Sequence, residues 1–315
     1  MPPSTEVLAT IPVEMEPQWL AIAPDGSRAY VTLQQFGGEH IRGGVAVIDT
    51  GSNTLVTTVE LGVPTGVVVA PDGRRVYVAN WGHGQGVVTV IDAGTNAVID
   101  NVVVNGHGAG TNGIVITPDG RHVYVASGNE DGMENQGKVS VVDTDTRAVV
   151  ARIVVNPFPA SGAAITPDGR FVWVLDNDGD TAVIDTASNE RTFPFEFEPI
   201  GDRVAFTPDG RLAYGVADAD TQIFVIDAVT HRVKAQTSAS GLTTDVAVTP
   251  DGRFVYITQR TRHQISVLEA GTGIVPTHPV EWFGTADGIA IMPDGRTAYV
   301  SDRHSRAVRV IPITA

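Results

Sequence analysis

The sequence predicts an all-β fold, a closed seven-bladed β-propeller formed by residues 1–315 as a single domain. Three observations predict it. The tripeptide Pro-Asp-Gly occurs seven times, at intervals of 41 to 49 residues, and self-similarity at such a period is typical of propellers and solenoids. Short stretches with the composition of β-strands flank each copy. No segment sustains the 3.6-residue apolar period of an amphipathic helix.

The Pro-Asp-Gly turn joins the first two strands of each repeat. An apolar stretch precedes it, as in residues 113–117, and an alternating β-branched and aromatic stretch follows, as in residues 122–125. Proline fixes φ at the first turn position, aspartate accepts backbone hydrogen bonds, and glycine adopts a positive φ. We therefore assign the turn aspartates to structure rather than to catalysis: Asp25, Asp72, Asp119, Asp168, Asp209, Asp251 and Asp294.

Two further strands complete each repeat. The third strand ends in Val-Ile-Asp or Val-Val-Asp, as at Asp49 and Asp143, and a polar turn leads into a fourth strand such as residues 55–61. Four antiparallel strands make one propeller blade. In the fourth blade, Trp173 replaces the tyrosine that the other blades carry in their second strand.

The two ends of the chain are predicted to share the last blade. After the final Pro-Asp-Gly only two strands follow, at residues 297–301 and 307–313, so that blade lacks its outer strand. Residues 6–13 have the pattern of an outer strand without a blade. Pairing of these segments would complete blade seven and remove two open sheet edges.

Residues 77–80 carry a resemblance to a known family. Their sequence, Tyr-Val-Ala-Asn after the Pro-Asp-Gly-Arg of residues 71–74, resembles the YVTN-family propeller repeat, and the similarity extends over nearly the whole chain. The same pattern is similar to that of lactonase-like propellers related to 6-phosphogluconolactonase. The resemblance implies the propeller fold, but it does not imply one function, because sites are grafted onto folds.

Charge and composition exclude several kinds of partner. Lys and Arg number 21 and Asp and Glu 36, a formal net charge of −15, which repels phosphate backbones and anionic lipids. No run approaches the roughly 18 apolar residues of a membrane span, and the first residues lack a signal-peptide pattern. We expect a monomer that binds a small organic molecule, with no nucleic acid and no membrane partner. It would be cytoplasmic, or a mature exported form without its leader.

The chemistry of the chain is limited by what it lacks. Cysteine is absent, which excludes disulfides, thiolate nucleophiles and cysteine metal sites. The sequence has no G-x-S-x-G, no Walker loop and no G-x-G-x-x-G after a strand. We therefore expect no cofactor, and chemistry of the acid–base type or none.

Antiparallel strands place the remaining loops on the face opposite the Pro-Asp-Gly turns. The longest loops between second and third strands are expected in the first three blades, at residues 33–44, 80–86 and 127–138. Variable loops on a rigid frame usually carry the sites. The mouth of the central channel on this long-loop face is therefore the predicted functional site.

Aromatic and histidine residues fall on that face. The aromatic residues predicted to line a pocket for an apolar or cationic ligand, or alternatively to cap the core, are Trp19, Phe36, Trp81, Phe158 and Trp282. The candidates for acid–base catalysis, which are otherwise solvated loop residues, are His40, His83, His107 and His304. His83 is the first choice, because glycines flank it, with His107 as its partner.

Polar residues cluster where the inner strands of blades five to seven begin. Asp202, Arg203, Asp245 and Asp287 gather there, and Asn112 is expected opposite them; Arg203 and Asn112 are also candidates for substrate binding. The cluster resembles the calcium site of gluconolactonase-like propellers, which makes Asp202, Asp245, Asp287 and Asn112 alternative ligands for Ca²⁺ or another divalent cation. A second interpretation is an Arg203–Asp245 ion pair that holds adjacent blades together.

Two functions agree with these patterns. The first is a non-redox, acid–base enzyme acting on a small molecule, namely a lyase, a cyclase or a lactone hydrolase. The second is a non-catalytic scaffold that binds a ligand or a protein. The long loops gather aromatic and histidine residues over part of the ring, which favours the enzyme.

Overall fold

The fold was analysed in a computed structural model of the 315-residue chain. The structure describes residues 7–35, 42–82, 84–107, 111–128, 137–156, 160–176, 181–192, 201–217, 220–271, 280–281 and 284–313. These residues form 28 β-strands and no helix, in seven antiparallel sheets of four strands each. The predicted fold class, an all-β seven-bladed propeller, is confirmed. The described part contains no helix long and apolar enough to cross a membrane.

The chain divides into two compact units. Unit 1 consists of Met1–Leu33, Ala46–Thr57 and Arg203–Ala315, and unit 2 consists of Gln34–Val45 and Thr58–Asp202. The organisation of the chain as one domain stays a prediction.

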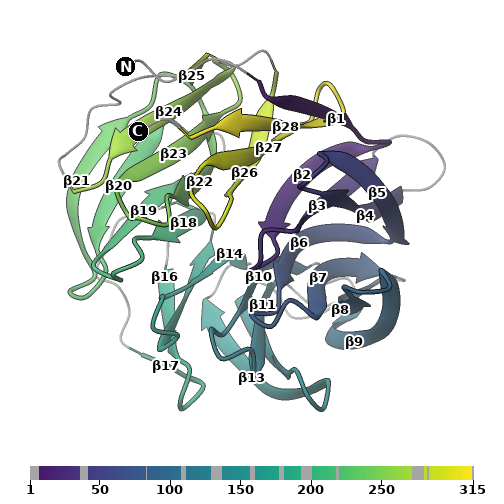
Figure 1. The fold of residues 1–315 in the computed structure, drawn as a ribbon. Helices are drawn as coiled ribbons and strands as arrows, with labels where there is room; N and C mark the ends of the chain where they lie inside the picture. Colours follow the sequence, from purple (N-terminus) through teal and green to yellow (C-terminus); the bar gives the residue numbers. More distant parts are fainter. Residues whose placement is uncertain are drawn as a thin grey trace. The chain divides into compact units, whose positions relative to one another are not determined.

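Four sheets contribute strands to unit 1, and the first of them also extends into unit 2. Their strands are β2 (Glu16–Ile22), β3 (Arg28–Gln35), β4 (Arg42–Asp49) and β5 (Thr54–Leu61); β18 (Arg203–Phe206), β19 (Leu212–Val216), β20 (Gln222–Asp227) and β21 (Arg232–Ser238); β22 (Thr243–Val248), β23 (Phe254–Gln259), β24 (Gln264–Glu269) and β25 (Val280–Glu281); and β26 (Ala286–Ile291), β27 (Thr297–Asp302), β28 (Ala307–Pro312) and β1 (Ala9–Pro12). The inner strands follow one another in space: β18 lies against β22, β22 against β26, and β26 against β2 (Figure 1).

Three sheets belong to unit 2. Their strands are β6 (Val63–Val69), β7 (Arg75–Gly82), β8 (Gln85–Asp92) and β9 (Ala97–His107); β10 (Thr111–Ile116), β11 (His122–Ser127), β12 (Gly137–Asp143) and β13 (Ala148–Asn156); and β14 (Ala160–Ile165), β15 (Phe171–Asp176), β16 (Thr181–Asp185) and β17 (Glu190–Arg191). Their inner strands also lie side by side, with β10 between β6 and β14.

The N-terminal strand completes the last sheet, as predicted. β1 pairs antiparallel with β28, and Ile11 lies opposite Val308. The backbone N–H of Leu8 donates to the carbonyl of Val310 at 2.8 Å, and that of Val13 donates to Arg306 at 2.9 Å. Ile11 and Val13 are buried, so this strand is part of the core of unit 1.

The Pro-Asp-Gly aspartates form turns, as their sequence context indicates. Asp119 is representative: its Oδ1 accepts hydrogen bonds from the Thr117 hydroxyl at 2.6 Å and from the Arg121 N–H at 3.0 Å. These bonds, that of Thr117 first, lower the pKa of the Asp119 carboxyl. Gly120 follows with a φ of +74°. The carboxylate therefore stays ionised and engaged within its own turn.

A buried aromatic ring in the second strand anchors each repeat. The residues that share this position are Tyr30, Tyr77, Tyr124, Trp173, Tyr214, Tyr256 and Tyr299. The hydroxyl of Tyr124 donates to Asn189 Oδ1 in the next sheet at 2.7 Å, and burial raises the pKa of Tyr124 to about 12. Each ring thus belongs to the core, and Trp173 takes the place of a tyrosine as predicted.

Gly113 allows the inner strands β10 and β14 to approach closely. A Cβ at this position would lie 2.5 Å from the backbone nitrogen of Ala163 and 2.7 Å from the carbonyl carbon of Gly162. Since backbone atoms cannot give way without moving the strand, we expect Gly113→Ala to lower the free energy of unfolding by about 1–3 kcal/mol.

Urea denaturation measures this change, and Gly94→Ala provides the control. A Cβ at Gly94 would meet its nearest neighbour, Asp92 Oδ1, at an ordinary 3.4 Å, so its effect should stay within about 0.5 kcal/mol. Equal effects of the two substitutions would contradict the importance of the close approach.

Candidate functional site

Polar and charged residues gather where the inner strands of unit 1 begin. Gln18 of β2 and Asp287 of β26 lie six residues before the turn proline, and Arg203 of β18 and Asp245 of β22 lie five residues before it. The pairing register of the inner strand shifts at this level in β22 and β26, and such irregularities re-aim side chains. We call Gln18, Trp19, Arg203, Asp245, Arg260 and Asp287 the inner-strand cluster.

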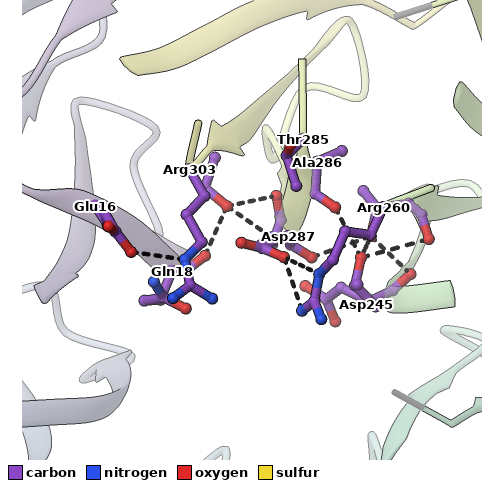
Figure 2. A network of polar contacts seen from close by, with 12 residues as sticks. Glu16, Gln18, Asp245, Arg260, Thr285, Ala286, Asp287 and Arg303 are labelled. Carbon is purple, nitrogen blue, oxygen red and sulfur yellow. Dashed lines mark hydrogen bonds and ion pairs between the residues drawn. The ribbon is translucent and has the colours of Figure 1, made fainter. Parts of the chain in front are cut away.

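Asp287 and Arg260 form the ion pair of this cluster (Figure 2). Both Nε and Nη2 of Arg260 lie 2.9 Å from Asp287 Oδ1. Asp287 is 1% exposed, so the arginine compensates a carboxylate that is removed from water. The Thr258 hydroxyl also donates to the backbone carbonyl of Asp287 at 3.1 Å, which ties β23 to β26.

Asp245 joins β22 to β26 through its carboxylate. Its Oδ1 accepts the N–H of Val246 and its Oδ2 accepts the N–H of Ile289, each at 2.9 Å. The residue is partly exposed, but protein surrounds the carboxyl group, and this burial raises the pKa of Asp245 to about 6. The Ile289 N–H and the charge of Arg203 lower that pKa, while the charge of Asp287 raises it further. The carboxyl therefore titrates close to neutral pH.

The raised pKa makes the stability of the protein depend on pH in a specific direction. The pKa of Asp245 is about 6 in the folded chain, against 3.8 for an ordinary aspartate, so between these values the folded state binds more protons than the unfolded state. Stability is therefore lost as the pH rises through 6, by up to about 3 kcal/mol.

Asp245→Asn removes this titration. We compare the free energy of unfolding of the variant with that of the wild type at each pH. When the pH rises from 4 to 7, we expect this difference to shift in favour of the variant by about 2–3 kcal/mol. Urea denaturation at both pH values checks it, since the other titrating groups are common to the two proteins. A difference that does not change with pH would contradict the raised pKa.

Arg203 stacks on Trp19. Its guanidinium carbon lies 3.9 Å from the centre of the Trp19 ring, although β22 and β26 lie between β18 and β2 in the row of inner strands. The sequence-based interpretation paired Arg203 with Asp245. In the structure Arg203 stacks on Trp19, and its charge also lowers the pKa of Asp245.

A second ion pair lies beside Gln18. Arg303 Nε donates to Glu16 Oε2 at 2.7 Å, and Figure 2 shows both residues next to Gln18. The backbone carbonyl of Gln18 accepts a hydrogen bond from the Ser301 hydroxyl at 2.7 Å. Its side-chain Nε2 is buried and has no hydrogen-bond partner among the described residues.

Two of the predicted residues of unit 2, Trp81 and His107, belong to one sheet. Residues 80–86 were expected to form a long loop, but β7 ends at Gly82 and β8 begins at Gln85. His107, expected in a loop of the next blade, ends β9 and lies opposite Gln85. Trp81 near the end of β7 is 38% exposed. The hairpin thus replaces the loop, and its second strand pairs with β9 as far as His107.

Other predicted site residues fall outside the described part. His40, His83, Phe36, Phe158 and Trp282 belong to this group, and the side chains of His107 and Asn112 are not described either. His304 lies in the exposed turn between β27 and β28, and Asp202 directly precedes β18. The roles assigned to these residues stay predictions.

The described side chains include no group of three or more His, Asp or Glu residues that could hold a metal ion. Asp202, Asp245 and Asp287 therefore do not form such a group. Asp287 instead has a cationic partner in Arg260.

Two hollows lie at the Pro-Asp-Gly turns, one in each unit. One of about 690 Å³ in unit 1 is lined by turn residues that include Asp209, Asp227 and Asp251, and one of about 600 Å³ in unit 2 includes Asp72 and Asp119. Hydrogen bonds within their own turns lower the pKa of Asp209, Asp227 and Asp251. These carboxylates serve the turns, so the hollows are weaker site candidates than the cluster.

Arg260 and Arg303 were missed by the sequence analysis. Each lies nine residues after the aspartate of its Pro-Asp-Gly turn, the same repeat position that Trp81 occupies. Alignment of the seven repeats at the end of the second strand would have placed both arginines on the face of the cluster.

Comparisons with known proteins agree with the fold. The family described as "Lactonase, 7-bladed beta-propeller" matches residues 162–314, the segment that carries Arg203, Asp245, Arg260 and Asp287. No curated protein matches the chain. Among solved structures, hydrazine synthase of Kuenenia stuttgartiensis is 21% identical with a TM-score of 0.77, over 96% of this chain and 97% of that one. A chain of the mitotic checkpoint complex is 16% identical with a TM-score of 0.82, over 99% and 93%. At these identities the likeness shows the fold alone.

Proposed function

We propose that this protein is a cofactor-independent enzyme of the acid–base type that hydrolyses a lactone. Asp245 carries the proposal, because its carboxyl has a pKa of about 6 beside the charge of Arg203. A group that titrates near the working pH is the most effective general acid or base. Support also comes from the lactonase family match, which covers this part of the chain.

The cluster contains groups suited to each part of the reaction. Ionised Asp245 takes a proton from the water that attacks the lactone carbonyl carbon; the ring C–O bond then breaks, and the ring oxygen takes that proton to give a hydroxy acid. Each carboxylate oxygen of Asp245 accepts one backbone N–H and keeps a second lone pair for this task. Arg203 supplies a positive charge for the oxyanion, and Trp19 supplies an apolar wall.

The histidine site predicted from the sequence is retained within the proposal as an alternative base. His107 ends β9 opposite Gln85, His83 lies outside the described residues, and a histidine can exchange protons at neutral pH. A lyase or a cyclase would use the same acid–base groups.

A non-catalytic scaffold is the second candidate function. The outer strands β9 and β13 carry exposed apolar side chains, with Ile99 and Val103 at 43% and 47% exposure and Val150 and Val154 at 53% and 56%. Exposed apolar residues grouped in this way are typical of interaction surfaces. Purification of the chain as a complex with another protein would favour this function.

Hydrolysis of a panel of γ- and δ-lactones tests the proposal. Each turnover releases a proton, so a pH indicator follows the reaction between pH 5 and pH 8. We expect at least one lactone to be hydrolysed, at a rate that rises with pH through about 6. A well-folded protein that hydrolyses none of them would contradict the proposal.

A further inference from the structure

We infer that the hollow at the Pro-Asp-Gly turns of unit 2 binds a small organic carboxylate, which accepts hydrogen bonds from the hydroxyl of Tyr77 and the guanidinium of Arg75. Both residues line this hollow of about 600 Å³. The inference rests on these two donors and not on the turn carboxylates. It concerns binding alone, by residues outside the inner-strand cluster, so it holds whether or not a lactone is turned over.

In two other sheets the tyrosine of the second strand has an acceptor that Tyr77 lacks. The hydroxyl of Tyr124 donates to Asn189 Oδ1 at 2.7 Å, and that of Tyr299 donates to Asn53 Oδ1. Each asparagine lies four residues after the aspartate that ends the third strand, at a φ of +54° in Asn53 and +56° in Asn189. A carboxamide oxygen from the next sheet thus accepts the hydroxyl proton of each of these tyrosines.

Arg147 occupies the position of this asparagine in the sheet that follows Tyr77. It keeps the positive φ, at +57°, but its Nη1 lies 3.3 Å from Oδ2 of Asp100 on β9, and a guanidinium has no acceptor to offer. No described residue accepts the hydroxyl proton of Tyr77. Tyr77 is 1% exposed, so its hydroxyl at the wall of the hollow needs an acceptor from water or from a ligand.

Arg75 makes an anion the favoured acceptor. Its Nη1 donates to the backbone carbonyl of Thr144 at 2.6 Å, and a side-chain hydrogen bond with Tyr77 raises the pKa of Arg75. The guanidinium is therefore held beside the hydroxyl, and it has five N–H donors in all. A carboxylate has two oxygens that suit these two neighbouring donors, and hydrogen bonds to an ionised acceptor are the stronger ones.

The charges around the hollow accommodate an anion, although the chain has a net charge of −15. The lining contains three arginines and three aspartates, which leaves no local excess of negative charge: Arg74, Arg75, Arg121, Asp72, Asp119 and Asp145. Asp72 and Asp119 each use Oδ1 within their own turn, for the N–H of Arg74 at 2.9 Å and of Arg121 at 3.0 Å. Ala70 and Pro71 also line the hollow and offer apolar surface to the rest of an organic acid.

Titration with sodium butyrate tests the inference, with sodium chloride at equal ionic strength as the reference. Saturation-transfer NMR of butyrate and the melting temperature report binding, and we expect a dissociation constant in the millimolar range. Tyr77→Phe should weaken binding at least about tenfold, because it removes a hydrogen bond to a charged group. Butyramide has the same shape without the charge, so it should bind more weakly than butyrate.

Two substitutions of Arg147 keep the test independent of folding. Arg147→Asn places a carboxamide at a φ that asparagine adopts readily; it should accept the Tyr77 hydroxyl and lower the butyrate affinity at least about tenfold. Arg147→Gly is the matched control, because it also loses the ion pair with Asp100 but adds no acceptor. It should bind butyrate as tightly as the wild type and melt at a lower temperature than Arg147→Asn.

Three results would overturn the inference. The first is an absence of butyrate binding to the wild type. The second is equal binding by Tyr77→Phe and the wild type, or by Arg147→Asn and Arg147→Gly. The third is tighter binding of inorganic phosphate than of butyrate, which would contradict the assignment of the ligand as a carboxylate.

Discussion

A chain without residues 2–13 should already be unfolded at 25 °C and should therefore show no cooperative thermal transition. The deletion removes β1, and with it the buried side chains of Ile11 and Val13, each of which contributes about 1.5–3 kcal/mol. It also removes the strand that pairs with β28 and leaves an open edge. A domain of this kind has a total stability of only about 5–15 kcal/mol, so the loss of two such side chains, about 3–6 kcal/mol, together with the open edge, is large enough to unfold it.

Thermal denaturation followed by circular dichroism measures this effect. Deletion of residues 2–6 is the control, because it leaves the hydrogen bond between Leu8 and Val310 and the whole of β1 in place. The shorter deletion should keep the melting temperature within about 2 °C. An unchanged melting temperature after the longer deletion would show that β1 does not hold the last sheet together.

The blades were predictable because each repeat carries the same local sequence pattern. A Pro-Asp-Gly turn, a buried ring and a closing Asp turn specify three strands, and Trp173 fits the pattern because its ring fills the same core position as a tyrosine. The loop expected at residues 80–86 was wrong for an equally local reason. Gly84 has a φ of +77° and lies in the short turn between β7 and β8, which closes a hairpin where the loop was expected.

The site was predictable only where it follows the repeat. Trp19, Arg203 and Asp245 share one repeat position, which is why the sequence brings them to one face. The stacking of Arg203 on Trp19 was not predictable, because the two residues belong to inner strands that are not neighbours. The charge of Arg203 also lowers the pKa of Asp245, the partner that the sequence favoured. The pKa of Asp245 depends on how closely the protein surrounds its carboxyl, and no residue spacing reports that.

The substitution Asp245→Asn is expected to lower kcat/KM for the hydrolysed lactone at least about a hundredfold. Asparagine keeps the size of the side chain and an acceptor oxygen for one of the two backbone N–H groups that Asp245 binds, while its NH2 group accepts neither the other N–H nor a proton from water. The wild-type rate should rise with pH through the pKa of about 6, and the residual rate of the variant should lose that dependence.

Three variants separate this base from the alternatives. Glu60→Gln is the control for a lost carboxylate, because Glu60 is 77% exposed and pairs only at the surface with Arg42; its activity should equal that of the wild type. His83→Ala and His107→Ala test the histidine site. Because Asp245 and these histidines belong to different units of the chain, loss of activity in a histidine variant with full activity in Asp245→Asn would move the catalytic base to unit 2. Loss in Asp245→Asn alone, with its pH dependence, assigns proton transfer to Asp245, whose pKa burial raises to about 6.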